Sequence, residues 1–369
     1  MRRILGIVLA VLLIGGVVAA IIAGGGGRKP DDTATKTVRG VIGSEKAEFF
    51  DDPEVRQALA AQGYDVKIET SGSWAMDKLP LADYDFAFPG SDEPAKEIAA
   101  KAGVKGAQST TPFSSPLVVL ARPPAAKALA GAGLASLTGP HTGVLRMEPF
   151  LKAAGEGATW QRITEGKAPP ELAGALYVRT ANPETSNSGA LFAGAVGYVA
   201  AGGAMVADDA AVARVKPLVK RLNDAQGSQS DGSDEPFRAL VSGGGEPLTL
   251  AYEAQVAALL AGPDGAKAGG TADGLVVLYP DTTVNAVHTF VPLKPGAAAL
   301  GTLLTEDPKL RALALRHGFR PTRGAAEFAK AAAPFTAWLN PGLTGIRQVG
   351  SPTVPILKKL TARTDGVSP

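Results

Sequence analysis

The chain has 369 residues, 45% hydrophobic and 20% charged, so it can bury a sizeable core as two domains or one two-lobed unit. Its formal net charge is +2 and its basic residues are scattered, which argues against a nucleic-acid-binding protein. There is no cysteine and the three histidines lack metal-ligand spacing, so we expect no disulfide, no metal and no cofactor.

The N-terminus carries an uncharged apolar run, residues 4–23, directly after Arg2 and Arg3. Twenty helical residues at about 1.5 Å each span the roughly 30 Å hydrocarbon core of a bilayer. The run is longer than a usual signal-peptide core, so we predict a single membrane span with an extracytoplasmic body. A passable cleavage site at residues 18–20 leaves a secreted form open. Residues 1–27 would be the anchor or signal sequence, and residues 28–36 a flexible tether.

From residue 37 onward, short β-branched segments alternate with Ala-rich helical stretches, which predicts an α/β fold. Strands are predicted at residues 37–43, 64–70, 83–90, 115–122, 141–147, 174–180, 247–253, 274–280 and 288–293. The nearly all-apolar strand 115–122 should be buried on both faces. Helices are predicted at residues 47–63 (interrupted at Pro53), 305–318 and 325–339, and residues 223–246 should form a mobile loop.

Four loops at predicted strand ends are rich in small hydroxyl side chains: "GSEK" (43–46), "TSGSW" (70–74), "PGSDEP" (89–94) and "TSNSG" (185–189). Ligands of open α/β sheets gather at such ends, where helix N-termini offer free N–H donors and about half a positive charge. The acidic residues of loop 89–94 favour a plain capped turn. Loops 70–74 and 185–189 contain no acidic residue, which favours an anion site. An ordinary N-cap is the alternative at each loop.

Charged residues near these loops give further candidates. Lys46 lies in a first helical turn, where the dipole disfavours a cation, so Glu45 or Glu48 balances it or a bound anion faces it. In "AYEAQ", Tyr252 and Glu253 could face the same cleft, although Glu253 could simply begin a helix.

Two further cations, Arg146 and Arg179, are candidates in the middle of the chain, with a plain surface position as the alternative. The sequence contains no G-x-S-x-G, H-E-x-x-H or Walker A motif, and no S-x-x-K with its partner motifs, so we predict that the chain is not an enzyme. A catalytic triad using His288 and a distant Asp stays open.

The segments "GSEK", "TSNSG", "AYEAQ" and "VVLYP…HTFVPL" resemble those of bacterial extracellular solute-binding proteins with the type 2 periplasmic-binding fold. That group includes sulfate, molybdate and phosphate receptors, and the resemblance covers most of residues 37–340. It implies two α/β lobes joined by two crossover strands, near Arg122 and near 281–287, and a solute enclosed by hinge closure. The implied parts are lobe 1 at 37–121 and 286–340, lobe 2 at 122–285, and a C-terminal extension at 341–369.

The resemblance also implies solute contacts from Ser44, Ser71 and Ser115 in lobe 1 and from residues 186–189 in lobe 2. With their neighbours, the predicted ligand-binding residues are Gly43, Ser44, Ser71, Ser73, Ser115, Thr185, Ser186, Asn187, Ser188, Gly189, Tyr252 and Glu253. Such receptors in one-membrane bacteria are usually lipoproteins, whereas this chain lacks a lipobox cysteine.

Together these features predict a membrane-anchored extracytoplasmic protein that encloses a small solute, preferentially an oxyanion. An ABC-type permease or another envelope protein would be its partner. Two alternatives are an exported hydrolase or transferase using the same cleft, and an envelope scaffold that binds a protein partner instead of a solute.

Overall fold

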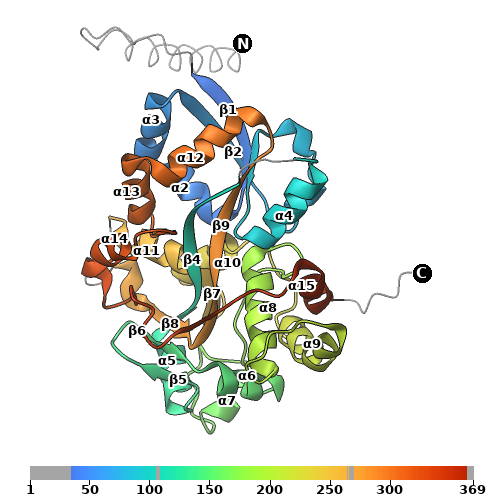
Figure 1. Ribbon diagram of the computed structural model, residues 1–369. Coiled ribbons are helices and arrows are strands. Elements are labelled where there is room, and N and C mark those ends of the chain that lie inside the picture. Colours follow the sequence, from blue (N-terminus) through green and yellow to red (C-terminus); the bar gives the residue numbers. More distant parts are fainter. Residues whose placement is uncertain (1–34, 105–108, 264, 266–269, 364–369) are drawn as a thin grey trace, which may run out of the picture. The chain divides into compact units, whose positions relative to one another are not determined.

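The computed structural model describes residues 35–104, 109–263, 265 and 270–363 (Figure 1). The chain divides into two units, Met1–Lys36 and Thr37–Pro369, and the description below concerns the second. The predicted membrane span at residues 4–23 lies outside the described residues. Within the part of the chain that the structure describes, no helix has both the length and the apolar character needed to cross a bilayer.

The described strands form one mixed sheet in the order β2-β1-β3-β9-β4-β8-β6-β5, with β7 and β10 also paired to β4 and β11 paired to β9. Their bounds are β1 Lys36–Ile42, β2 Tyr64–Thr70, β3 Phe86–Phe88, β4 Thr110–Ala121, β5 Ala135–Leu137, β6 Thr142–Leu145, β7 Leu248–Tyr252, β8 Val276–Pro280, β9 Thr282–Pro292, β10 Arg320–Pro321 and β11 Arg347–Val349.

Two long strands, β4 and β9, run through both halves of this sheet (Figure 1). The end of β9 pairs with β3, and most of β9 pairs antiparallel with the first half of β4, as far as Pro116 opposite Asn285. From Leu117 onward, β4 pairs with β7 and β8 instead. We call the β2-β1-β3 half with its helices lobe 1 and the β7, β8, β6, β5 half with its helices lobe 2. The lobe boundaries given by residue number above stay a prediction.

Helices cover the two half-sheets. Those of lobe 1 are α2 Ala47–Asp51, α3 Pro53–Ala61, α4 Asp92–Lys101, α12 Ala298–Glu306 and α13 Pro308–Arg316. Those of lobe 2 are α5 Pro123–Gly131, α6 Met147–Gly155, α7 Trp160–Ile163, α8 Asn187–Ala200, α9 Asp209–Asp224, α10 Asp234–Val241 and α11 Glu253–Ala261. The chain ends with α14 Ala325–Ala331 and α15 Val354–Thr361. Single 3-10 turns lie at Ser44–Lys46, Met76–Lys78, Leu81–Asp83, Thr271–Gly274, Pro295–Ala297 and Ala333–Phe335.

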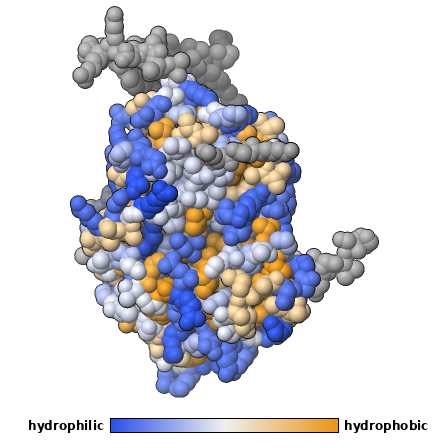
Figure 2. Space-filling view, viewed as in Figure 1, coloured by the Kyte–Doolittle hydropathy of each residue, from blue (hydrophilic) through white to orange (hydrophobic). Residues whose placement is uncertain are grey.

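Each lobe has its own hydrophobic core. Lobe 1 is aromatic, with the rings of Phe86 and Phe290 stacked at 4.7 Å between centroids. Lobe 2 packs Leu and Val side chains of α6, α8 and α9 on one face of its sheet. The other face is covered partly by Phe328 and Trp338, which follow α13 in the chain. On the face shown in Figure 2, hydrophilic and apolar residues are interspersed.

The strand predictions hold best for short segments between clear turns. β1, β2, β7 and the split helix at Pro53 are confirmed, as is the burial of residues 115–121 on both faces. β4 begins five residues before, and β9 six residues before, the position predicted. Both extensions cross between the lobes, where Thr, Ser and Pro interrupt the apolar pattern.

Two expectations are wrong. Residues 174–180 form no strand and pair with neighbouring segments only at isolated bridges, one of them between Arg179 and Thr249 of β7. The Arg179 guanidinium donates to the carbonyls of Gln226 and Ser228. Residues 223–246 contain helix α10, because Phe237 and its neighbours bury an apolar face on lobe 2.

We predict that Phe290→Ala lowers the free energy of unfolding by about 3–5 kcal/mol, the usual cost of emptying a buried aromatic site. Phe290 is fully buried and stacked in lobe 1. Denaturant titration measures the change. Leu137→Ala is the control, because Leu137 is 39% exposed on β5 and its truncation should cost less than about 0.5 kcal/mol. Equal losses in both variants would contradict the description of this core.

Candidate functional site

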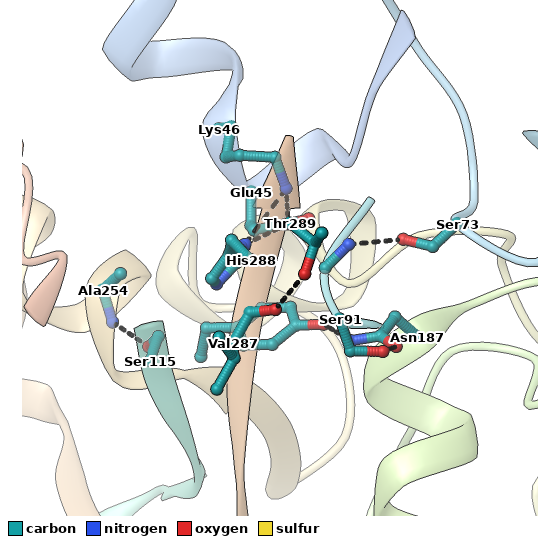
Figure 3. A network of polar contacts seen from close by, with 12 residues as sticks. Glu45, Lys46, Ser73, Ser91, Ser115, Asn187, Ala254, Val287, His288 and Thr289 are labelled. Carbon is teal, nitrogen blue, oxygen red and sulfur yellow. Dashed lines mark hydrogen bonds and ion pairs between the residues drawn. The ribbon is translucent and has the colours of Figure 1, made fainter. Parts of the chain in front are cut away.

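Side chains from the starts of three helices meet at Asn187, the first residue of α8 (Figure 3). Ser91, which precedes α4, donates through Oγ to Asn187 Oδ1 at 2.6 Å. Asn187 Nδ2 donates to the hydroxyl of Tyr252, which precedes α11, at 3.0 Å. Ser91 belongs to lobe 1 and the other two residues to lobe 2, so the network crosses between the lobes. All three residues are at most 3% exposed.

The hydroxyl groups at the start of α8 do not cap that helix. Ser186 occupies the N-cap position without a side-chain hydrogen bond to the first turn, and its Oγ lies 3.0 Å from Ser188 Oγ. The first turn of α8 contains no acidic residue either. The partial positive charge of this helix start is therefore directed at the Ser and Asn side chains between the lobes.

Two of the predicted serines hold loops in place around this network. Ser73 Oγ accepts a hydrogen bond from Gly90 N at 2.9 Å, next to the end of β3. Ser115 Oγ, on β4, accepts one from Ala254 N at 3.0 Å and so satisfies an amide of the first turn of α11. Both side chains are buried.

The other predicted residues have local partners. Gly43 N donates to Phe88 O, Ser71 Oγ to Gly72 O and Thr185 Oγ1 to Asp231 Oδ1. Gly189 lies against backbone, since a Cβ there would be 2.4 Å from Ala181 O. Ser44 faces Gly232 across the lobes, where a Cβ would be 2.8 Å from its Oγ.

The two lobes are in direct contact beside these loops. Trp74 N donates to Thr185 O at 2.9 Å, a backbone hydrogen bond from lobe 1 to lobe 2. A Cβ at Gly72 would lie 2.5 Å from Thr185 O, and one at Gly90 would lie 2.7 Å from Asn187 Nδ2. Glycine is thus required at position 72, where the approach is to backbone, whereas a side chain at position 90 would have to displace the Asn187 side chain.

A buried charged cluster lies next to the network, at the β9 crossover. Lys46 Nζ contacts the Glu45 carboxylate and lies 3.1 Å from His288 Nδ1, and His288 Nδ1 lies 3.2 Å from Glu45 Oε1 (Figure 3). The three side chains are at most 5% exposed. Lys46 Nζ also lies 5.0 Å from the centre of the Phe88 ring. Glu45 is therefore the residue that balances Lys46.

Burial shifts the pKa of every member of this cluster. Burial first, and then the Lys46 charge, lower the pKa of His288 to about 4, so its imidazole is neutral. Burial also lowers the pKa of Lys46, against the pull of Glu45. Burial acts to raise the pKa of Glu45, but Lys46 and His288 together hold it below its usual range. Burial, followed by the Glu45 charge, raises the pKa of Tyr252.

Glu253 and the two arginine candidates are engaged elsewhere. Both carboxylate oxygens of Glu253 accept from Arg320, at 2.6 and 2.8 Å, and one also accepts from Tyr279. Arg146 donates to the carbonyl of Gly133, and Arg179 to backbone carbonyls as described above. Glu253 therefore ties α11 to β10 instead of facing Asn187.

His288 is the one histidine in this buried cluster. His288 contacts Glu45 and Lys46 through Nδ1, and its Nε2 is buried with no hydrogen-bond partner in the described residues. Among those residues, no group of three or more His, Asp or Glu side chains is placed to hold a metal ion.

The predicted ligand-binding residues did not include Ser91 or His288, and His288 was considered only as a possible member of a catalytic triad. Loop 89–94 was interpreted as a capped turn, yet Ser91 makes no cap hydrogen bond and reaches across to Asn187. The available signal in the sequence was the position of Ser91 in a hydroxyl-rich loop at the end of a predicted strand. His288 gave no such signal, because its partners Glu45 and Lys46 lie more than 240 positions away in the sequence.

No protein-family profile matches this chain, and no curated protein matches it. Among solved structures it is similar to the periplasmic binding protein AfuA from Actinobacillus pleuropneumoniae (12% identity, 89% of this chain and 94% of that chain, TM-score 0.55). It is also similar to a ferric binding protein from Campylobacter jejuni (9% identity, 88% and 95%, TM-score 0.52) and to apo ferric ion-binding protein A from Pasteurella haemolytica (10% identity, 88% and 94%, TM-score 0.52). The chain has the type 2 periplasmic-binding fold.

The pKa of His288 predicts how stability depends on pH. Between about pH 6.5 and 4 the unfolded chain binds a proton at this histidine that the folded chain does not, so stability falls as the pH falls. From about pH 7 to 4.5 the loss should be about 2–3 kcal/mol, at about 1.4 kcal/mol per pH unit.

Denaturant titrations at several pH values should show this slope, and His288→Gln should flatten it. His141→Gln is the control, because His141 is 20% exposed in lobe 2, is stacked on Trp338 and does not belong to the buried cluster. An unchanged slope in His288→Gln would contradict the assignment.

Proposed function

We propose that this chain is an extracytoplasmic solute-binding protein that holds a small solute between its two lobes without chemical conversion. The observation that carries the proposal is the network of Ser91, Asn187 and Tyr252. In this network, side chains from helix starts in both lobes are hydrogen-bonded to one another. A solute bound there would contact both lobes only when they are closed, so binding would favour closure. AfuA, which has this fold, was solved with fructose-6-phosphate bound, and the other two neighbours are named as ferric binding proteins.

We further propose that the solute is an oxyanion or carries an anionic group. The start of α8 has no acidic residue and no side-chain cap, so its N–H groups and partial positive charge favour an anion. Ser186, Ser188 and Tyr252 add hydroxyl donors. The nearby Glu45 carboxylate is neutralised by Lys46, which limits its repulsion of an anion.

The proposed cellular setting is the outer face of the membrane, with residues 4–23 as an anchor and an ABC-type permease or another envelope protein as partner. This part of the proposal is supported by the apolar run in the sequence and by the periplasmic proteins that share the fold.

We predict that a thermal-shift screen of sulfate, molybdate, tungstate, phosphate, tellurite, sugars and amino acids will find a stabilising solute. At about 100 times its Kd, a solute adds about 2.7 kcal/mol, which corresponds to a rise of several degrees in Tm. The double variant Ser186→Ala/Ser188→Ala should lose this rise, whereas Ser136→Ala, on the edge strand β5, should keep it. A full response in the double variant would count against the loop.

Deleting residues 1–30 should give a folded protein that needs no detergent. The reason is that the described sheet and both lobe cores lie beyond residue 35. Size-exclusion chromatography and circular dichroism test this outcome. Aggregation of the shortened chain would argue against a separable anchor.

A second candidate function is an envelope scaffold that binds a protein partner. Direct contact between the lobes favours it: Trp74 N bonds to Thr185 O, and Glu48 of lobe 1 pairs with Arg238 of lobe 2 at 2.8 Å. Small-angle scattering separates the two functions, because a solute-binding protein changes its compactness with its solute. A chain that responds to no solute in either assay would be assigned to the scaffold class.

A further inference from the structure

The last helix of the chain, α15, lies beside α8 and α9 of lobe 2 and next to α4 of lobe 1 (Figure 1). The chain reaches this position after β11 pairs in parallel with the start of β9. We call residues 347–363 the C-terminal strap. Sequence reasoning treated this segment only as an extension, yet it contacts both lobes.

The strap is anchored on lobe 2. Ile356 and Leu360 are buried in the core that α8 and α9 also form. Lys359 Nζ pairs with Asp209 at the start of α9, at 2.6 Å, and Arg363 N donates to the Glu184 carboxylate at 3.2 Å. These contacts fix one face of α15 to lobe 2.

The neighbouring face of α15 contacts lobe 1. Leu357 packs with Trp74, from the loop after β2, and with Ala190 of α8 in a separate small apolar cluster. Lys358 pairs with Glu97 on α4, and its Nζ lies 5.8 Å from the centre of the Trp74 ring. Trp74 is only 8% exposed, so α15 and α8 together cover a side chain of the opposite lobe.

We infer that the C-terminal strap acts as a clasp, which means that it stabilises the closed arrangement of the lobes. The contacts of Lys358 with Glu97 and Trp74 are the ones that break when the lobes open. Opening of the lobes would break the Lys358–Glu97 pair and expose Trp74, while the contacts of α15 to lobe 2 stay intact. The strap therefore sets how often the polar site opens, and this regulatory role rests on the proposed solute-binding function.

The test is a distance measurement between the lobes in the full-length chain in detergent, with no solute added. The chain has no cysteine, so Gln57→Cys on α3 and Lys127→Cys on α5 provide two unique, exposed sites for spin labels. Double electron–electron resonance then reports the closed and open populations.

Lys358→Glu replaces attraction to Glu97 by repulsion and should raise the open population about two- to five-fold, the scale for a half-exposed ion pair. Adding Glu97→Lys restores opposite charges and should return the distribution to that of the parent. Lys359→Glu is the matched control, because its partner Asp209 lies within lobe 2 and the distribution should not change.

An unchanged distribution in Lys358→Glu, or an equal change in Lys359→Glu, would overturn the clasp. Glu97→Lys alone gives a second, independent disruption of the same pair if Lys358→Glu does not fold. Because no solute is present, a failed clasp leaves the solute-binding proposal standing. Conversely, a strap that controls opening in a chain that binds no solute would reject the proposed function alone.

Discussion

The antiparallel pairing of β4 with β9 is the constraint on which the rest of the structure depends. These strands are the central ones through which the two half-sheets are hydrogen-bonded, and Ser115 and His288 lie within the paired region. Any rotation of one lobe against the other must be absorbed by twisting this ribbon or by the segments flanking it. The candidate polar site thus lies beside the strands that join the two lobes, and the proposed closure would alter its geometry directly.

The Glu45, Lys46 and His288 cluster shows how the crossover region tolerates charge. A buried ion pair is stable only when its partners are close and further hydrogen bonds are made, and here a neutral imidazole supplies the third partner. The cluster joins the first turn after β1 to β9. It therefore lies on the lobe 1 side of the candidate site, where the His288 ring is 5.6 Å from the Tyr252 ring of lobe 2 between centroids.

The fold class could be predicted from the sequence, whereas the contacts of the candidate site residues could not, and the difference has a physical cause. Loop 185–189 was recognisable because four polar residues stand at one helix start, where one cap would suffice. The roles of His288, Ser91 and Glu253 depend on partners that only folding brings together, 242, 96 and 67 positions away. Strand 174–180 was overpredicted since periodicity does not show whether pairing continues beyond an isolated bridge.

Under the proposed function, the hydroxyl surplus at the start of α8 would also limit which solute can bind. Ser91, Asn187 and Tyr252 are hydrogen-bonded to one another, so a solute bound there would have to replace those hydrogen bonds with equally good ones. A molecule with too few acceptors would leave buried donors unpaired, at a cost of about 1–3 kcal/mol each. An anion with several oxygens can accept from both lobes at once, whereas an apolar solute cannot. Selectivity would then arise from competition between the solute and the contacts that already join the lobes.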